Sequence, residues 1–78
     1  MDSHLRPLTV LGSSLSKNVL VKVKWNREYR GTLDGYDQHM NLVMKNAEEV
    51  IGDKSTGVLP LVVVRGDVVV YISPSEVI

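Results

Sequence analysis

The sequence predicts a mostly β domain, in which a short N-terminal α-helix precedes a strongly bent, five-stranded antiparallel small barrel. Three observations support this fold class. Apolar and polar residues alternate with a period of two in the first half of the chain, two glycines interrupt the second alternating segment, and two later segments are almost wholly apolar. The 78 residues are enough for one small domain, residues 1–78.

A helix of about two turns is expected over residues 5–12. Pro7 suits the first turn of a helix, where a missing backbone N–H costs nothing. Gly12 and the two serines after it provide a stop signal. Four leucines recur at roughly helical spacing and form an apolar stripe, which would most simply cover the open end of a sheet: Leu5, Leu8, Leu11 and Leu15.

The first strand is indicated by valines at every second position from Val19 to Val23, which alternate with lysines. Trp25 continues this alternation and is interpreted as a packing residue. Residues 25–27 then form a tight turn, in which Asn26 tolerates a positive φ.

Two further strands are expected before the middle of the chain. Residues 28–36 alternate again, and Gly31 and Gly35 within them indicate strong bending or the close approach of another backbone. Such bends occur at the corners of small barrels. A third strand follows from Met40 to Lys45, where apolar and polar residues alternate once more.

The second half of the chain predicts contacts between subunits. Residues 46–57 are polar and are interpreted as a solvated loop or a long hairpin. Residues 58–64 and 68–72 are apolar on both faces, which one small core cannot bury, so something outside the chain must cover them. Exposed apolar edge strands favour edge-to-edge pairing, and head-to-tail pairing of unlike edges closes into a ring when the rotation permits.

Composition excludes several classes of site. The chain has no cysteine and two histidines, so neither a disulfide framework nor a metal site is expected, and no cofactor is predicted. No segment has the length of a signal peptide core or a membrane span, and a cytoplasmic location is expected. Nine basic and nine acidic residues give a net charge of zero, so any nucleic-acid binding must depend on a local concentration of charge.

Two polar turns form the candidate site. The first is Asp37-Gln38-His39-Met40-Asn41, between two strands, and the second is Arg65-Gly66-Asp67, between the two valine-rich segments. We expect these turns to meet in space and to form one pocket. His39 and Arg65 would be its walls, and Asn41 would recognise what lies between them.

These residues resemble those of the Sm and Sm-like (LSm) proteins. Residues 19–50, with Asp37-x-His39-Met40-Asn41, look like the first Sm motif, and residues 62–74, with Arg65-Gly66-Asp67, look like the second. Together with a helix that starts at Arg6-Pro7-Leu8, the resemblance covers nearly the whole chain. The uninterrupted chain without a tail looks most like an archaeal Sm-like protein.

The resemblance implies a ring of identical subunits, a heptamer in the first place and a hexamer in the second. In the family, such rings bind uridine-rich single-stranded RNA at the inner rim. They act as scaffolds or chaperones in RNA processing.

The family's site falls on six residues of this chain. His39 and Arg65 would stack on a base, Asn41 would read it, Asp37 would hold the Asn41 side chain, and Gly66 would let the second turn come close. Met40 is expected to point into the core beneath the pocket. The amide of Asn41 offers a donor and an acceptor that match the O4 and N3–H of uracil. Two departures from the family stand out: Trp25-Asn26 replaces a common glycine, and residues 46–57 carry no basic run.

Other readings of the same residues remain open. His39 could be an ordinary exposed histidine, Asn41 a turn cap and Arg65 a solvated cation. The whole protein could be a subunit of a mixed protein-interaction ring in which RNA binding is incidental. It could also be a nuclease that uses Asp34, Asp37 and His39, although no second carboxylate cluster supports an enzyme.

Overall fold

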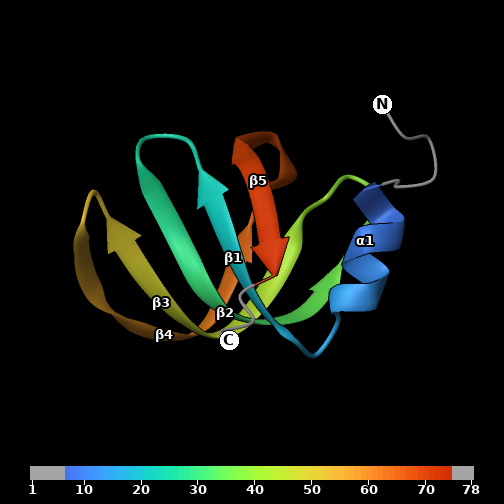
Figure 1. The fold of residues 1–78 in the computed structure, drawn as a ribbon, viewed down its shortest axis with the longest axis horizontal. Coiled ribbons are helices and arrows are strands. Elements are labelled where there is room, and N and C mark those ends of the chain that lie inside the picture. Colours follow the sequence, from blue (N-terminus) through green and yellow to red (C-terminus); the bar gives the residue numbers. More distant parts are fainter. Residues whose placement is uncertain (1–6, 75–78) are drawn as a thin grey trace.

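The computed structural model describes residues 7–74, in which one strongly bent antiparallel sheet carries the helix at one end (Figure 1). The strands pair in the order β4-β3-β2-β1-β5. The expected fold class is confirmed. In chain order the elements are α1 (Pro7–Ser14), β1 (Asn18–Val23), β2 (Arg27–Tyr36), β3 (Leu42–Ile51), β4 (Lys54–Val64), the 3-10 helix η1 (Gly66–Val68) and β5 (Val69–Pro74).

The helix continues two residues beyond the expected end at residue 12 and stops at Ser14. Its expected start at residue 5 lies outside the described residues. The chain leaves the helix through Ser16, which has a left-handed φ of 65°, and the backbone N–H of Lys17 donates to the carbonyl of Ser14 at 3.0 Å. The helix therefore ends at the last residue of the expected stop segment, residues 12–14, and not at Gly12 itself. Leu11 is buried in the core, so the helix does cover the end of the sheet.

The concave side of the sheet encloses one hydrophobic core. The alternation of β1 is as expected, because Val19, Val21 and Val23 all point into it. β2 contributes Tyr29 and Leu33 from its own alternating positions. The buried cluster consists of Leu11, Val19, Val21, Val23, Tyr29, Leu33, Leu42, Met44, Ala47 and Val64.

The turn between β1 and β2 corrects the expectation for Trp25. Trp25 and Asn26 both have a left-handed backbone, with φ of 68° and 56°, as in the mirror-image turns of tight hairpins. The alternation of β1 therefore ends at Val23, where the chain reverses. The indole of Trp25 is 75% exposed, so its interpretation as a packing residue is wrong, whereas the positive φ of Asn26 is confirmed.

The sheet bends sharply where β2 crosses β3 at Gly31. The pairing changes register between Arg30 and Thr32, and Asn46 of β3 takes a left-handed φ of 51° opposite them. A Cβ at Gly31 would lie 2.7 Å from the Cα of Ala47 and 2.9 Å from the carbonyl oxygen of Lys45. Gly31 therefore permits the close backbone approach that its position in the strand indicates. Gly35 lies at a second change of register, after Leu33, but has open space around it.

Residues 46–57 form a long hairpin rather than a solvated loop. β3 extends to Ile51 and β4 begins at Lys54, with Gly52 at a φ of 66° in the turn. Glu49 holds the two strands together, because its carboxylate accepts hydrogen bonds from the hydroxyls of Thr56 and Tyr29, each at 2.9 Å. These bonds lower the pKa of Glu49. The second of the two expected alternatives is therefore the observed one, and its residues are polar because this part of β4 is exposed while its backbone pairs with β3.

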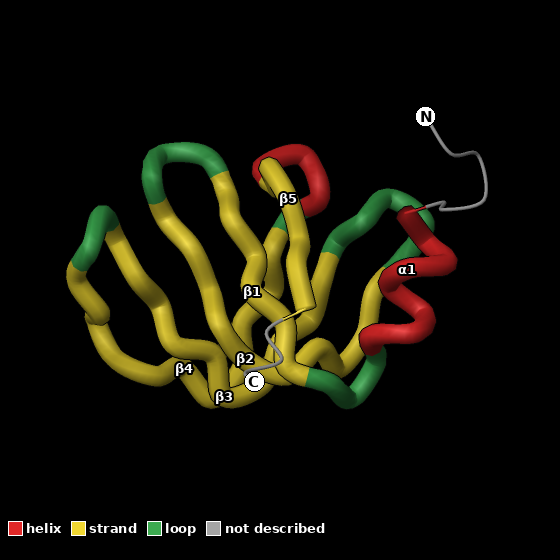
Figure 2. Tube along the Cα trace, viewed as in Figure 1, coloured by secondary structure: helices red, strands yellow, loops and turns green. Residues whose placement is uncertain are grey.

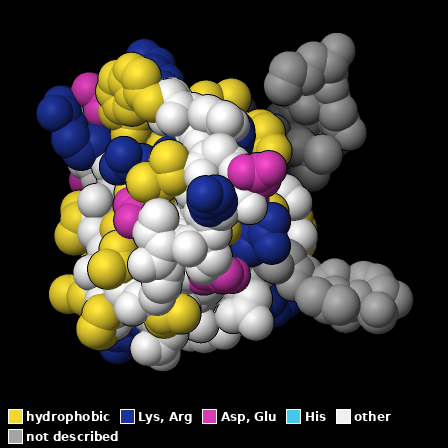
Figure 3. Space-filling model, turned by 90° about the vertical axis from the view of Figure 1, so that its left-hand side faces the viewer, with side chains coloured by type: hydrophobic (Ala, Val, Ile, Leu, Met, Phe, Trp, Pro, Cys, Tyr) yellow, Lys and Arg dark blue, Asp and Glu magenta, His cyan; other side chains and the backbone are white. Residues whose placement is uncertain are grey.

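The two edges of the sheet carry exposed apolar side chains. β4 and β5 stand at opposite ends of the strand order. Val63 of β4 is 65% exposed and Val70 of β5 is 58% exposed. Apolar side chains also reach the surface between lysine and arginine residues on the side of the molecule shown in Figure 3. Further large apolar side chains exposed on these strands are Val58, Leu59, Leu61 and Tyr71.

The bend can be tested with a matched pair of glycine substitutions. Gly31→Ala would place a methyl group against the backbone of Ala47, and overpacking of this kind costs roughly 1–3 kcal/mol. Gly35→Ala meets nothing within 4 Å and serves as the control. In chemical denaturation at one fixed protein concentration, the midpoint should fall for Gly31→Ala and stay close to wild type for Gly35→Ala. Equal midpoints for the two variants would contradict this account of the bend.

Candidate nucleic-acid interface

The loop between β2 and β3, residues 37–41, is closed by its own backbone. The N–H of Asp37 donates to the carbonyl of Asn41 at 3.1 Å, and the N–H of Met40 donates to the carbonyl of Asp37 at 3.0 Å. Met40 has a left-handed φ of 64°, and its half-buried side chain packs against the core. The loop lies next to α1 in Figure 2. Met40 thus anchors the loop from below, as expected.

The Asp37 carboxylate organises this loop from within. One of its oxygens accepts the backbone N–H of His39 at 2.8 Å and that of Asn41 at 3.0 Å. The other oxygen accepts the Asn41 side-chain amide at 2.9 Å. The bond from the Asn41 side chain is the main cause that lowers the pKa of Asp37, and the backbone N–H groups add to it. Asp37 therefore holds the Asn41 side chain in place, which is the role that the resemblance implied for it.

The Asn41 side chain joins the two turns of the candidate site. While its nitrogen donates to Asp37, its oxygen Oδ1 accepts the backbone N–H of Gly66 at 2.7 Å. The turns of residues 37–41 and 65–67 therefore meet in space, as predicted. A primary amide has two N–H donors and two acceptor lone pairs. One donor and one lone pair of Asn41 remain for a ligand, in an orientation that the other two fix.

Gly66 is required at this junction for steric reasons. A Cβ on this residue would collide with the carbonyl oxygen of His39 and would lie 2.9 Å from the carbonyl carbon of Met40. The backbones of the two turns are therefore in direct contact. Any larger residue at position 66 would push the turns apart and break the bond to Asn41.

Arg65 lies beside this junction and faces solvent. Its guanidinium pairs with the carboxylate of Asp67 at 2.9 Å, and both side chains are mostly exposed. An exposed pair of this kind contributes at most about 1 kcal/mol, so Arg65 can exchange Asp67 for another partner at little cost. Arg65, Asp37 and Asn41 line one cavity of about 620 Å³.

The structure brings together most of the six predicted residues. Asp37, Asn41 and Gly66 are hydrogen bonded, Arg65 shares their cavity, and Met40 supports the loop. His39 is exposed and contacts the second turn through its backbone, but its side chain does not line the cavity. The roles of these side chains toward a ligand stay predictions.

Three apolar lining residues were not assigned to the site from the sequence. Tyr36, Val43 and Val63 form part of the cavity wall next to Asn41 and Arg65. Val43 and Val63 are paired across β3 and β4, on the face of the sheet away from the core. The register of the two strands would have revealed them, but the sequence does not determine that register.

The two carboxylates proposed for a nuclease are occupied by structural contacts. Both oxygens of Asp37 accept hydrogen bonds within its loop, and Asp34 forms an ion pair with Lys45 at 3.4 Å. Within residues 7–74, no group of three or more His, Cys, Asp or Glu side chains could hold a metal ion. In the same part of the chain, no helix is long and apolar enough to cross a membrane.

Comparison with known proteins agrees with this geometry. The model of the LSM domain matches residues 9–74. An snRNP Sm-like protein of Thermoplasma acidophilum is 51% identical over 74 residues, covering 95% of this chain and 89% of the relative. One from Archaeoglobus fulgidus is 53% identical over 70 residues, covering 90% and 91%.

Two solved structures are similar over most of the chain. A Pyrococcus abyssii Sm protein in complex with a uridine heptamer has a TM-score of 0.85 and 44% identity, and covers 91% of this chain and 100% of its own. A heptameric Sm-like protein from Pyrobaculum aerophilum has a TM-score of 0.83 and 39% identity, and the match covers 91% of this chain and 95% of the other. The resemblance drawn from the two sequence motifs is confirmed.

The role of Asp37 predicts how stability depends on pH. Because the folded pKa of Asp37 is lowered, its contribution to stability is fully present above the ordinary value of 3.8 and is lost as the pH falls through the lowered value. Asp37→Asn should therefore be less stable than wild type at neutral pH, and this difference should disappear in acid. Thermal unfolding of both proteins, in steps of roughly 0.5 pH units from pH 7 to pH 2.5 or below, measures this difference in stability.

Asp34→Asn is the control for this series, because its carboxylate touches Lys45 on the neighbouring strand and none of the loop. In Asp34→Asn, the NMR signal of the Asn41 side-chain amide should stay close to that of wild type. An Asp37→Asn variant with the stability and the Asn41 amide signal of wild type at pH 7 would show that the carboxylate does not organise the loop.

Proposed function

The chain belongs to the LSM-domain family of Sm-like proteins, and we propose that it forms a ring that binds uridine-rich single-stranded RNA without changing it covalently. The observation that carries this proposal is the Asn41 amide, fixed between Asp37 and Gly66 with one donor and one acceptor free. The solved Sm protein with a uridine heptamer, 44% identical to this chain, supports the choice of ligand.

The free donor and acceptor of Asn41 would select the base. Uracil presents a carbonyl acceptor at O4 next to the N3–H donor, which pairs with both free groups of the amide. Cytosine presents the opposite pattern, an amino donor beside an unprotonated nitrogen. It would leave the fixed amide unpaired, at a cost of about 1–3 kcal/mol for each unsatisfied buried group. The hydrogen bonds to Asp37 and Gly66 prevent the amide from turning over to suit cytosine.

In this proposal, stacking contributes most of the affinity at each site. His39 is exposed on the loop and Arg65 is exposed on the second turn, so both planar groups can reach a base held by Asn41. Base–aromatic stacking contributes about 1–3 kcal/mol per base, so one site alone binds weakly. Repetition around a ring raises the affinity, because neighbouring sites act on one strand at a high effective concentration.

The edges of the sheet support assembly into the ring. β4 and β5 end the strand order and expose valines at Val63 and Val70, so β4 of one copy can continue the sheet of the next copy through β5. Unlike edges pair head to tail, and such pairing closes into a ring when the rotation between copies permits. The similar P. aerophilum protein is a heptamer, and we expect seven copies here, with six as the other candidate.

As part of the same proposal, the ring acts in the cytoplasm as a scaffold or chaperone in RNA processing. Such a role needs a repeated binding surface and no reacting group. The carboxylate closest to the site, Asp37, serves to hold the loop.

The base preference can be tested at Asn41. Wild type should bind oligo(U) at least about tenfold more tightly than oligo(C), since this ratio corresponds to 1.4 kcal/mol. Asn41→Ala should bring the two affinities together, while stacking preserves part of the total affinity. Fluorescence anisotropy with labelled oligonucleotides measures both. Asn18→Ala, which removes an exposed amide that accepts a hydrogen bond from the Thr32 hydroxyl and lies outside the site, is the control. Full uridine preference in Asn41→Ala would assign base reading to another group.

Assembly can be tested at the β5 edge. Val70 is exposed in the single chain, so Val70→Asp should leave the fold of one subunit intact but bury an unpaired charge in the ring. Native mass spectrometry should show a ring for wild type without any added protein and smaller species for Val70→Asp. Leu15→Asp, an exposed apolar residue outside β4 and β5, should keep the ring. A wild-type chain that assembles only with other proteins would favour the mixed protein-interaction ring instead.

A further inference from the structure

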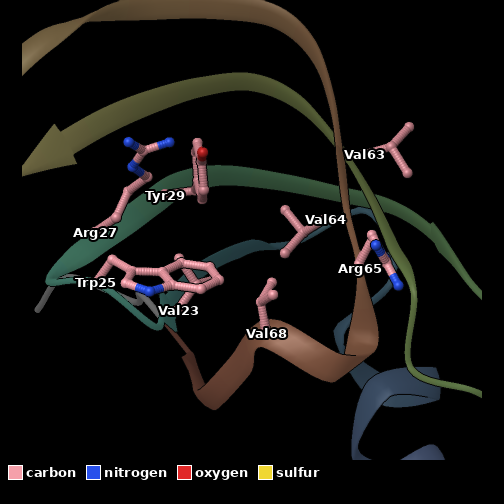
Figure 4. Close-up of a pocket in the computed structure, with 8 residues that line it drawn as sticks. All are labelled: Val23, Trp25, Arg27, Tyr29, Val63, Val64, Arg65 and Val68. Carbon is pink, nitrogen blue, oxygen red and sulfur yellow. The ribbon is translucent and has the colours of Figure 1, made fainter.

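A second cavity of about 180 Å³ lies beside the turn between β1 and β2 (Figure 4). Val23, Val64 and Val68 give it an apolar wall, and Trp25 and Arg27 line it from the turn. In Figure 4 the indole of Trp25 extends over Val23 toward Val68. The backbone N–H of Lys24 donates to the carbonyl of Val68 at 2.9 Å, which fixes η1 against this turn. The cavity is therefore built from elements that are held together.

Trp25 occupies a position that is unfavourable for a tryptophan in two ways. Its φ of 68° is left-handed, a conformation that glycine and asparagine adopt readily and a bulky residue does not. Its indole is also 75% exposed, although tryptophan is among the residues with most to gain from burial. The indole is thus only a quarter buried, and folding of the turn gains little from it. Backbone outliers of this kind concentrate at functional sites, which suggests that the side chain serves a ligand.

Arg27 provides a donor that has no partner in the described residues. Its Nε is buried and makes no hydrogen bond, and its Nη1 approaches the Glu49 carboxylate only at 3.7 Å. A buried donor without an acceptor is unfavourable by about 1–3 kcal/mol. The Nε is enclosed in this conformation, so a ligand in the cavity could supply its acceptor only if the Arg27 side chain, 42% exposed as a whole, turned toward the cavity.

The chemistry of the lining matches a nucleotide. An exposed indole offers a stacking face, and the guanidinium groups of Arg27 and Arg65 offer cations to a phosphate or a base carbonyl, while no carboxylate lines the cavity. The volume is below the roughly 300–1,000 Å³ of sites that enclose whole drug-sized ligands, so it suits a single ring system with its backbone outside.

The position of the cavity connects it with the first site. Arg65 and Val63 line both cavities, so the two cavities adjoin at these residues, and a strand bound at Asn41 could continue from one into the other. We propose that the Trp25 cavity is a second base-stacking subsite for the same single-stranded RNA, which extends the contact of each subunit beyond one nucleotide. This proposal rests on the proposed function, since it assigns a second contact to the same ligand.

A neighbouring copy of the chain is the other occupant to consider. Ring contacts are expected at the edges β4 and β5, whereas Trp25 stands on the turn between two strands from the interior of the strand order, β1 and β2. The two guanidinium groups also favour an anionic ligand over the exposed apolar side chains of β5. The experiment below distinguishes the two occupants.

Trp25 is the only tryptophan of the chain, so its fluorescence reports on this cavity alone. We expect the emission of the assembled ring to be accessible to iodide before RNA is added. An oligo(U) of about 15 nucleotides, long enough for more than one contact per subunit, should then quench it and protect it from iodide. Emission that is already protected in the RNA-free ring and does not respond to RNA would place a neighbouring subunit on the indole and overturn the proposal.

Two variants separate stacking from folding. Trp25→Asn suits the left-handed turn and removes the indole, so its thermal midpoint should equal or exceed that of wild type, and its ring mass should not change. Its affinity for the 15-nucleotide oligo(U) should fall roughly fivefold to a hundredfold, the range for loss of one base–aromatic stack. Trp25→Tyr keeps an aromatic face and should recover most of this loss. Because stacking tolerates any base, the ratio of oligo(U) to oligo(C) affinity should remain near that of wild type in both variants.

The outcomes also distinguish this proposal from the proposed function. If wild type binds oligo(U) with its uridine preference and Trp25→Asn binds equally well, the second subsite is wrong and the first stands. If Trp25→Tyr is as weak as Trp25→Asn, stacking is not the contribution of Trp25 and the subsite is again wrong. If wild type shows no affinity for oligo(U), both proposals fail together.

Discussion

The hydrogen bonds of the Asn41 side chain are the constraint on which the candidate site depends. One side chain joins Asp37 of the first turn to the backbone of Gly66 in the second, over distances of 2.9 and 2.7 Å. These turns follow β2 and β4, strands separated by β3 in the sheet, so the sheet must bring their ends together before the bond can form. Asn41 then fixes both turns at once, and a single amide serves as structural link and as recognition group.

The sheet meets this requirement by bending at Gly31. The extra residue of β3 opposite it, with Asn46 in a left-handed conformation, lets the same strands curve around a small core and still pair along their length. The same curvature leaves β4 and β5 as edges with exposed valines. A domain of this size buries only a modest core, so in the proposed ring its stability would be coupled to its assembly. The site and the surfaces for assembly are two results of one bend.

The alternation of residues predicted the strands of the first half and their buried faces, because one side of each strand meets the core and the other meets water. It failed at Trp25, where the chain reverses and the period of two no longer describes burial. It left residues 46–57 undecided, because exposed strand residues such as Thr56 have the composition of a loop. For the site, the amide of Asn41 indicated recognition, and the resemblance assigned Asp37 to holding that amide. Only the structure shows that half of the hydrogen-bonding capacity of Asn41 is used internally.

The ion pair between Arg65 and Asp67 has a consequence for how a ligand arrives. The nearest cation of each site carries its own counter-charge at 2.9 Å, and the chain as a whole has no net charge. Long-range attraction of a polyanion therefore contributes little to the rate of encounter. In the proposed ring, a strand that arrives by chance can still displace Asp67 from Arg65 once it is in contact. Discrimination between ligands then lies in how long each one stays bound, and the dissociation rate rather than the association rate should separate a preferred RNA from the rest.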